Sequence, residues 1–506
     1  MIFVVVKNVK RVLRPVRQRL VKSFIGDAVR YVRSVRHAGY TRVKQVLASI
    51  RPWLVQSFIG DAVRNVRSIR HAGYNKVKHV LASIRPWLVK SFIGDTIRSM
   101  RATRYFWQKR VTLKVIKQSL LDNQGRLIIA FPIIPWNFRW QRPQHIISLL
   151  QNNGFSVLFV AMTLAPLERQ LQGKRDAISH LSFNELASHT YKIWVNSNRN
   201  LNVYTDLIEQ DDLFNISLSI EALIAELKPK SIIYLIQFPG WWPVTQALRN
   251  KLGGSIIFDC MDDHSGFTTN APHIAQTEKA LMENADFIIT SSNLLEEQAK
   301  SINPNTIQVK NGTEFAHFTN PIKNGELDYL SARPIIGYYG AISDWFDMRL
   351  VADCALHRPD WNFVLIGSTF GADLTPVDGL KNVYFLGEKP YKQLPGYLAY
   401  FDVCLIPFKI IPLTLATNPV KFYEYLSAGK PVVSVALQEL IPYQEDCYLA
   451  TNTKEFLAQL DSAYAERNDA IKIECRLKLA RENSWDARGR AILASKIFQK
   501  HLESVN

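Results

Sequence analysis

Short apolar runs alternate with amphipathic segments between about residues 126 and 500 of this chain. Each run ends at a polar or glycine-containing turn, after which apolar residues return at helical spacing. This alternation predicts an α/β protein with parallel sheets and helices on both faces, because parallel strands are buried on both sides. Two sets of strands predict two domains with a cleft between them. The expected strands are 127–131, 156–161, 231–236, 255–259 and 287–290, then 335–339, 362–366, 383–386, 403–406 and 431–435.

The first 120 residues follow a different pattern. Residues 21–54 return at 55–88 with 28 of 34 positions identical, and a third, partial copy starts at Val89. In the second copy, apolar residues within 58–69 fall on one helical face, and Gly73 suits the end of the helix. A shorter helix follows in each unit. We therefore predict an all-α region of repeated helical hairpins ahead of the two sheets.

Charge is distributed unevenly along the chain. The formal net charge is +18, yet residues 1–120 hold 27 Lys and Arg against only three Asp, which leaves −6 for the remainder. Basic residues beside apolar stripes that also carry Trp and Phe suit amphipathic helices in an anionic membrane interface. Nucleic acid would also attract this charge, and the stripes could instead pack on one another. We expect residues 1–110 to contact an anionic membrane surface and do not expect nucleic acid as a partner.

Cysteine usage and hydropathy bear on the compartment. The five cysteines show no metal-type pairing, and their odd number suits buried thiols in a reducing compartment. No apolar run approaches the roughly 20 residues that a spanning helix needs. We therefore expect a cytoplasmic protein that associates peripherally with the inner face of the membrane.

Residues 418–434, NPVKFYEYLSAGKPVVS, combine a helix, a glycine stop and a buried strand. Gly429 suits a left-handed helix end, and Pro431 prevents the helix from continuing. At the carboxyl ends of parallel strands, a helix N-terminus near Asn418 would face phosphate through its free N–H groups. Glu424 could then bind the two ribose hydroxyls. An ordinary amphipathic helix with a solvated Glu would give the same pattern.

Five segments resemble, in this order, bacterial glycosyltransferases of the GT-B type. The likeness is greatest to the retaining nucleotide-sugar family that includes teichuronic-acid and exopolysaccharide glycosyltransferases. It covers about residues 126–500, including ENSWDARGRAI at 482–492, and leaves out the basic repeats. The segments are WNFRWQRPQHIISLLQNNGFSVLFV (136–160), FDCMDDHSGF (258–267), ADFIITSSNLL (285–295), VKNGTEFAHF (309–318) and NPVKFYEYLSAGKPVVS (418–434).

The internal repeat and the resemblance together imply a four-part layout, in which the resemblance accounts for two Rossmann-like, doubly wound domains and a final helix. Basic helical repeats take residues 1–120, and an N-terminal domain on the acceptor side takes residues 121–320. A C-terminal domain on the nucleotide-sugar side takes residues 321–480, and a helix in residues 481–506 crosses back to the first domain.

The resemblance also assigns the donor side of the site. Glu424 matches the ribose-binding Glu of the family, and Lys421, Asn418 and Gly340 are the further donor-binding candidates. Lys421 one turn before Glu424 could equally form a helix ion pair. Relatives often carry a second Glu where this chain has Ala416.

Relatives also often carry an Arg and a Lys after the first strand of the second domain, where this chain reads GAISDWFDMR. A diphosphate clamp is therefore missing at that position. We expect Arg139 and Arg142, which follow the first strand of the chain, to reach across the closed cleft and replace it. An Arg before Pro143 at a helix start could instead be a surface cap.

The candidate residues for the acceptor side of the site follow two of the expected strands. Asp262 lies where several relatives place a His facing the transferred sugar, so Asp262 and Asp263 are candidates for contact with the sugar or the acceptor hydroxyl. A capping pair of Asp residues is the alternative. Trp241 and Trp242 could stack on a sugar ring, and core packing would explain them equally.

The function that follows is transfer of a sugar from a nucleotide-sugar donor to a glycan, polysaccharide or lipid-linked acceptor, by an enzyme of the hexosyltransferase type. Retention of configuration and independence of metal are implied by the resemblance, with no cofactor beyond the nucleotide-diphosphate sugar that serves as substrate. A GT-B sugar-nucleotide epimerase is a second enzymatic reading. The missing clamp and Ala416 leave a third, non-enzymatic reading: a degenerate transferase that acts as a nucleotide-sugar sensor or scaffold.

Overall fold

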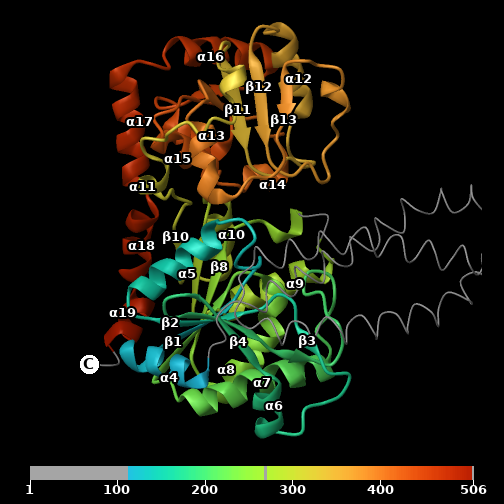
Figure 1. Ribbon diagram of the computed structural model, residues 1–506. Helices are drawn as coiled ribbons and strands as arrows, with labels where there is room; N and C mark the ends of the chain where they lie inside the picture. The colour runs from blue at the N-terminus through green and yellow to red at the C-terminus, as the bar shows by residue number, and fades with distance from the viewer. Residues whose placement is uncertain (1–111, 267–269, 504–506) are drawn as a thin grey trace, which may run out of the picture. The chain divides into compact units, whose positions relative to one another are not determined.

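A computed structural model describes residues 112–266 and 270–503 of the 506-residue chain. The helical repeats were predicted for residues 1–120. Of this range, only residues 112–120 belong to the described part of the chain. The described residues form two mainly parallel sheets with helices on both faces (Figure 1). The predicted α/β class with two doubly wound sheets is therefore confirmed.

The first sheet has eight strands in the order β10-β9-β8-β7-β1-β2-β5-β4. Neighbouring strands run parallel, except that β4 and β5 form an antiparallel hairpin at one edge. The strands are β1 (Arg126–Phe131), β2 (Ser156–Val160), β4 (Ser182–Ala187), β5 (Thr190–Trp194), β7 (Ser231–Ile236), β8 (Ser255–Cys260), β9 (Phe287–Thr290) and β10 (Thr306–Gln308), with β3 (Ala165–Pro166) and β6 (Asn196–Ser197) paired separately.

Side chains of β1 alternate between the two faces of this sheet. Leu127, Ile129 and Phe131 join a core with α7 and α8, whereas Ile128 and Ala130 pack with α5 on the other face. An unbroken apolar strand is the expected sequence for a strand covered on both sides. The helices are α4 (Leu113–Asp122), α5 (Arg142–Asn152), α6 (Lys174–His180), α7 (Gln210–Leu227), α8 (Trp242–Leu252), α9 (His273–Asn284), α10 (Asn293–Ile302) and α11 (Phe315–Phe318).

Helix α4 corrects one predicted boundary. It lies largely within the range assigned to the basic repeats, yet Ile116 and Leu120 are buried in the core of the first sheet and the helix contacts α7. These two apolar residues, four positions apart, form a helical face that needs cover. The domain that holds the first sheet therefore begins before residue 121.

The second sheet has six strands, all parallel, in the order β13-β12-β11-β14-β15-β16. Strand order reverses between β11 and β14, which is where ligands bind in open sheets of this kind. The strands are β11 (Ile335–Tyr339), β12 (Asn362–Ile366), β13 (Val383–Phe385), β14 (Val403–Ile406), β15 (Val432–Val435) and β16 (Tyr448–Ala450).

The last helices of the chain return to the first sheet. Helix α17 contacts α15 beside the second sheet, and α18 then contacts α5 beside the first. Trp485, the first residue of α18, packs in the core that contains α5. The helices are α12 (Met348–His357), α13 (Leu394–Leu398), α14 (Pro412–Leu415), α15 (Val420–Ser427), α16 (Thr453–Ala465), α17 (Ala470–Glu482), α18 (Trp485–Leu493) and α19 (Lys496–Glu503).

Gly337, in the middle of β11, marks a close approach between the sheet and the segment that precedes β14. A Cβ atom at this position would lie 2.1 Å from the ring of Phe401, which is itself fully buried. Phe401 packs in the core of the second sheet. Only a glycine leaves room for the ring.

We predict that Gly337→Ala destabilises the protein by about 1–3 kcal/mol, because the added methyl overpacks the core. Urea unfolding followed by tryptophan fluorescence measures the change. The same substitution in a Phe401→Leu background should cost less, because leucine has no ring at the point of contact. An equal cost in both backgrounds would contradict this origin.

Candidate active site

The helix predicted to bind the donor lies at the carboxyl end of the second sheet. Helix α15 begins after Pro419, and Gly429 beyond its end has φ 69°, the left-handed conformation predicted for it. Lys421 Nζ lies 2.9 Å from Glu424 Oε2, and Glu424 is only 1% exposed. The helix ion pair left open by the sequence is therefore present. Lys421, at 19% exposure, is the end of this pair that solvent reaches, and the ribose role of the buried Glu424 stays a prediction.

Aromatic side chains surround this ion pair. The Lys421 ammonium lies 5.1 Å from the ring centroid of Tyr339, the last residue of β11. Burial, followed by the charge of Glu424, raises the pKa of Tyr339 well above its usual value, and the same two causes raise the pKa of Tyr391. The Glu424 carboxylate thus lies close to two protonated phenols, in a setting that stabilises a hydrogen-bonded acceptor.

A histidine from the first sheet's domain approaches the same cluster. His145 on α5 stacks on Trp485 with ring centroids 4.8 Å apart. Burial, followed by the positive charge of Lys421, lowers the pKa of His145 to about 3. His145 therefore stays neutral at physiological pH and brings no second cation to Lys421.

Two of the predicted donor residues have their polar groups engaged. The Gly340 N–H donates to the Ile366 carbonyl (2.9 Å), and its backbone, with φ 149°, crosses that of Gly367 at close range. The Asn418 side chain is buried and accepts the backbone N–H of Asn311 (3.0 Å). The Asn418 side chain therefore holds the segment that links the two sheets and is not free to bind the donor, whereas the predicted role of the backbone N–H groups near Asn418 stays a prediction.

The two arginines expected to replace the diphosphate clamp behave differently. Arg139 reaches the second domain, where its Nε donates to Glu388 Oε1 (2.7 Å) in a half-exposed pair. Arg142 is 2% exposed and donates to Asp259 (2.9 Å) and to the Val309 carbonyl (2.7 Å). A guanidinium enclosed in this way cannot meet a diphosphate, so its predicted role and the surface-cap alternative are both corrected.

The loop after β8 gathers the acceptor-side candidates. Burial raises the pKa of Asp262 to about 7, although the Arg142 guanidinium acts to lower it. Burial, followed by the charges of Asp263 and Asp262, raises the pKa of Glu278 to about 8. His264 is 1% exposed, and neither of its ring nitrogens has a hydrogen-bond partner among the described residues. A carboxyl group whose pKa lies near neutral pH can exchange a proton with a substrate hydroxyl.

This loop lies close to the donor half of the structure. A Cβ atom at Gly266 would lie 3.4 Å from Leu413 of α14, the short helix that precedes α15. Ala416, where relatives often carry a Glu, is buried and packs in the core of the first sheet. The chain between α14 and α15 thus contacts the first domain, and the Ala416 side chain is buried in that contact.

The two tryptophans predicted to stack on a sugar belong to the core. Trp241 is fully buried, its Nε1 donates to the Pro132 carbonyl (3.0 Å), and its ring packs on Phe131. Trp242 is 6% exposed. A ring covered by protein cannot stack on a sugar, so this prediction is wrong and the core-packing alternative holds.

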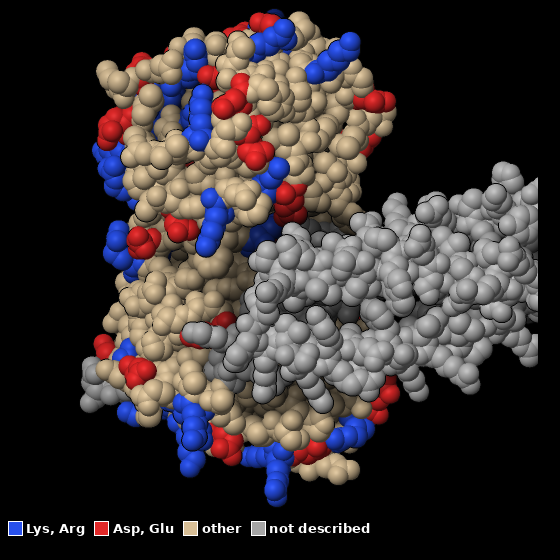
Figure 2. Space-filling view, in the orientation of Figure 1, with Lys and Arg blue, Asp and Glu red and all other residues tan. Residues whose placement is uncertain are grey.

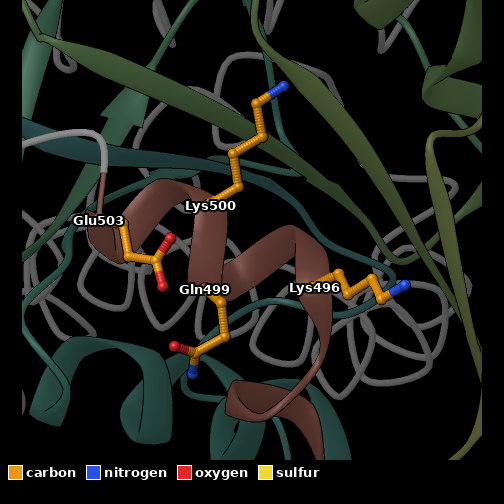
Figure 3. A pocket seen from close by; sticks show the side chains of 4 residues that line it. All are labelled: Lys496, Gln499, Lys500 and Glu503. Carbon is orange, nitrogen blue, oxygen red and sulfur yellow. The ribbon is translucent and has the colours of Figure 1, made fainter.

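Cavities do not mark the site. A shallow hollow of about 500 Å³ is lined by Lys496, Gln499, Lys500 and Glu503 of α19, which project in different directions (Figure 3). A groove of about 390 Å³ lies at the carboxyl ends of β14, β15 and β16 and is lined in part by Lys409. Neither hollow is lined by Glu424. The polar cluster at the strand ends is the better guide, because solvated helix side chains hold no ligand by themselves.

Comparison with known proteins agrees with this arrangement. The family model described as "Glycosyl transferases group 1" matches residues 333–466. TuaH of Bacillus subtilis (strain 168), named as a teichuronic acid biosynthesis glycosyltransferase, is 27% identical over 286 residues, which cover 52% of this chain and 71% of TuaH. The chain is a GT-B glycosyltransferase.

Solved structures share the fold of this GT-B glycosyltransferase at low sequence identity. Sucrose-phosphate synthase from Thermosynechococcus elongatus has a TM-score of 0.56 at 15% identity, covering 74% of this chain and 99% of that one. A trehalose-6-phosphate structure from E. coli, bound with UDP-2-fluoro glucose, has a TM-score of 0.52 at 14% identity, covering 73% and 98%. Anabaena HepE in complex with UDP and glucose has a TM-score of 0.50 at 14% identity, covering 72% and 98%.

Several residues in or near the candidate site were missed by the sequence analysis. Tyr339 and Tyr391 look like ordinary core aromatics, and nothing in the sequence places them beside Glu424. His264 follows two candidates directly and could have been included as a third polar residue of the same loop. Lys409 donates to the Asp344 carbonyl (2.7 Å), which brings a cation into the loop where relatives carry basic residues.

We predict that Glu278→Gln raises the thermal unfolding temperature at pH 8.5 by about 2 °C or more, with no gain at pH 4.5. The pKa of Glu278 is about 8 when folded and about 4.3 when unfolded. Between these values the folded state binds more protons, so stability falls as pH rises, and glutamine removes that fall. The exposed Glu283 on the same helix provides the control Glu283→Gln. Parallel pH profiles for wild type and Glu278→Gln would contradict the raised pKa.

Proposed function

We propose that this glycosyltransferase moves a sugar from a nucleoside-diphosphate sugar to a glycan, polysaccharide or lipid-linked acceptor. The observation that carries the proposal is the Lys421–Glu424 pair, buried at the carboxyl end of β11 where the strand order of the second sheet reverses. Glu424 would accept the ribose hydroxyls. Lys421, released from Glu424 by that exchange, would turn to the diphosphate.

The reaction breaks the bond between the anomeric carbon and the diphosphate oxygen and forms a bond to an acceptor hydroxyl, which gives up its proton. Asp262 and Asp263, on the loop after β8, are proposed to contact the sugar or that hydroxyl. A carboxyl with a pKa of about 7 can accept and release a proton near neutrality. Arg139 is proposed to supply positive charge from the first domain. Its side chain already reaches Glu388 on a loop of the second domain.

Retention of configuration and independence of metal are part of the proposal. A trehalose-6-phosphate synthase of the same fold, with a TM-score of 0.51, is described in terms of glycosyltransfer with retention. Lys421 and Arg139 are the side chains proposed to neutralise the leaving diphosphate in place of a metal. The scaffold alternative is not favoured, because the relatives with which this chain is compared are named as glycosyltransferases and synthases.

The membrane role is proposed from the sequence of the basic arm. Of the helices in residues 112–266 and 270–503, none combines the length and the apolar character needed to cross a bilayer. Lys and Arg are interspersed with Asp and Glu on the face of the described residues shown in Figure 2, so this face carries no basic stripe. Attraction to an anionic membrane, and placement at the inner face of the membrane, are proposed for residues 1–110, which hold 25 Lys and Arg against three Asp.

We predict that Glu424→Gln weakens nucleotide binding roughly 10- to 100-fold, because a hydrogen bond to a charged group contributes about 1.5–3 kcal/mol. A thermal-shift screen of UDP, ADP, GDP and dTDP first selects the nucleotide, and calorimetry then measures its affinity. The control is Glu455→Gln, since Glu455 is an exposed carboxylate that accepts the Thr451 N–H at the start of α16. Unchanged affinity in Glu424→Gln would remove Glu424 from the donor site.

We predict that deleting residues 1–110 abolishes binding to vesicles of anionic lipid while nucleotide binding persists. The described residues hold their own cores, and 25 of the 27 basic residues counted in the first 120 lie within the deleted segment. Vesicle co-sedimentation measures the effect, with neutral vesicles and high salt as controls. Equal partitioning of the full and shortened chains onto anionic vesicles would contradict the membrane role.

A further inference from the structure

Glu439 is a buried carboxylate that no part of the proposed chemistry uses. It lies in the 3₁₀ turn Gln438–Tyr443 after β15 and is 1% exposed. Its Oε1 accepts the backbone N–H of Asn293 (2.7 Å), and its Oε2 lies 2.9 Å from Lys310 Nζ and accepts the Asn418 Nδ2–H (3.3 Å). One carboxylate from the second domain thus contacts three separate segments.

The contact with Asn293 joins the two domains at a helix end. Asn293 is the first residue of α10, which follows β9 of the first sheet. Its N–H is one of the donors that a helix cannot satisfy internally, and a negative charge at this end is stabilised by the helix dipole. Glu439 therefore supplies to α10 a capping acceptor that comes from the other domain.

The contact with Asn418 leads to the helix proposed to bind the donor. Asn418 precedes Pro419, the N-cap of α15. Besides its bond to Glu439, it accepts the Asn311 N–H (3.0 Å), and its backbone oxygen accepts the Asn311 Nδ2–H (2.6 Å). Both residues are buried, so these bonds replace contacts with water that the groups have lost.

From Asn311 the hydrogen bonds continue into the first sheet. Asn311 Oδ1 accepts from Arg142 (3.3 Å), which is paired with Asp259 at 2.8 Å. Asp259 lies on β8, and the loop that follows β8 carries Asp262. A continuous set of buried polar contacts thus runs from the acceptor-side strand to the first turn of the donor-side helix.

We propose that Glu439 is a positioning residue that fixes the first turn of α15 relative to α10. We call Glu439, Lys310, Asn311, Asn418 and Arg142 with Asp259 the interdomain network. It would set the separation between the donor-side and acceptor-side residues, so its role in the reaction rests on the proposed function. Its effect on α10 and α15 does not depend on bound nucleotide, so it can be measured in the free protein.

The direct test is hydrogen exchange in the full chain without nucleotide. In Glu439→Gln, amide exchange should speed up about 10-fold or more in two segments at once, residues 292–297 and residues 417–423. The matched control Glu455→Gln removes a carboxylate that caps α16 from within its own domain. It should speed up exchange near residues 451–456 only.

Lys310→Met provides an independent variant. It removes the cation that faces Glu439, so it should also speed up exchange in both segments, and the double variant with Glu439→Gln should show less than the product of the single effects. If Glu439→Gln fails to fold, Lys310→Met alone carries the test, and faster exchange in both segments is still expected. A response in one segment alone, or in neither, would overturn the proposal.

A functional readout separates this proposal from the assignment of the donor site. UDP affinity measured by calorimetry should stay within about threefold in Glu439→Gln, while turnover with UDP-glucose falls, because ground-state contacts remain and alignment is lost. If exchange speeds up in both segments but the protein does not bind UDP, the positioning role stands and the proposed UDP-type donor is contradicted. UDP binding lost by more than tenfold in Glu439→Gln would instead make Glu439 part of the binding site.

Discussion

A buried arginine must be paired with a negative charge. In this protein the pairing of one buried arginine connects the first sheet to the segment that leads to the second domain. Arg142 opens α5 and ends in an ion pair with Asp259 on β8, with further bonds to the segment that leaves the sheet. Removing one partner of such a pair costs about 3–5 kcal/mol, because the other charge is left buried and unpaired. The start of α5, the end of β8 and the linker to the second domain are therefore held in one arrangement.

The same contacts position the second domain. Asn311 is held by Arg142 on one side and bonds to Asn418 on the other, so the start of α15 is fixed from the first sheet. Lys421 and Glu424 follow within two turns of that helix. Buried contacts with the first sheet thus fix the position of the helix that carries the candidate residues Lys421 and Glu424, and fixed positioning is one requirement of preorganised catalysis.

The sequence predicted the sheets well and the long-range polar contacts poorly. Strands 335–339, 362–366 and 403–406 agree with the structure to the residue, because a strand buried on both faces is apolar from end to end. The β4–β5 hairpin was missed because its burial is mixed and its polar residues interrupt the apolar pattern. Local features of α15, including the glycine stop and the Lys–Glu spacing, follow from helical geometry and could be predicted.

The roles of Arg142 and Asn418 could not be predicted in this way. Their partners lie 117 and 107 positions away in the chain, so no local pattern indicates that their polar groups are already used. Trp241 shows the same limit, because burial of its ring depends on the packing of the strand and helix around it. A polar or aromatic residue after a strand marks the edge where ligands bind, but only tertiary contacts show which side chains remain free.

We propose that the donor binds at the carboxyl end of β11, with Glu424 on the ribose. A crystal structure of the protein with the nucleoside diphosphate that stabilises it most would test this claim directly. We expect ribose hydroxyls within hydrogen-bond distance of Glu424, with Lys421 turned from Glu424 to the diphosphate. A nucleotide bound in the groove beside Lys409 and α16, with the Lys421–Glu424 pair intact, would contradict it.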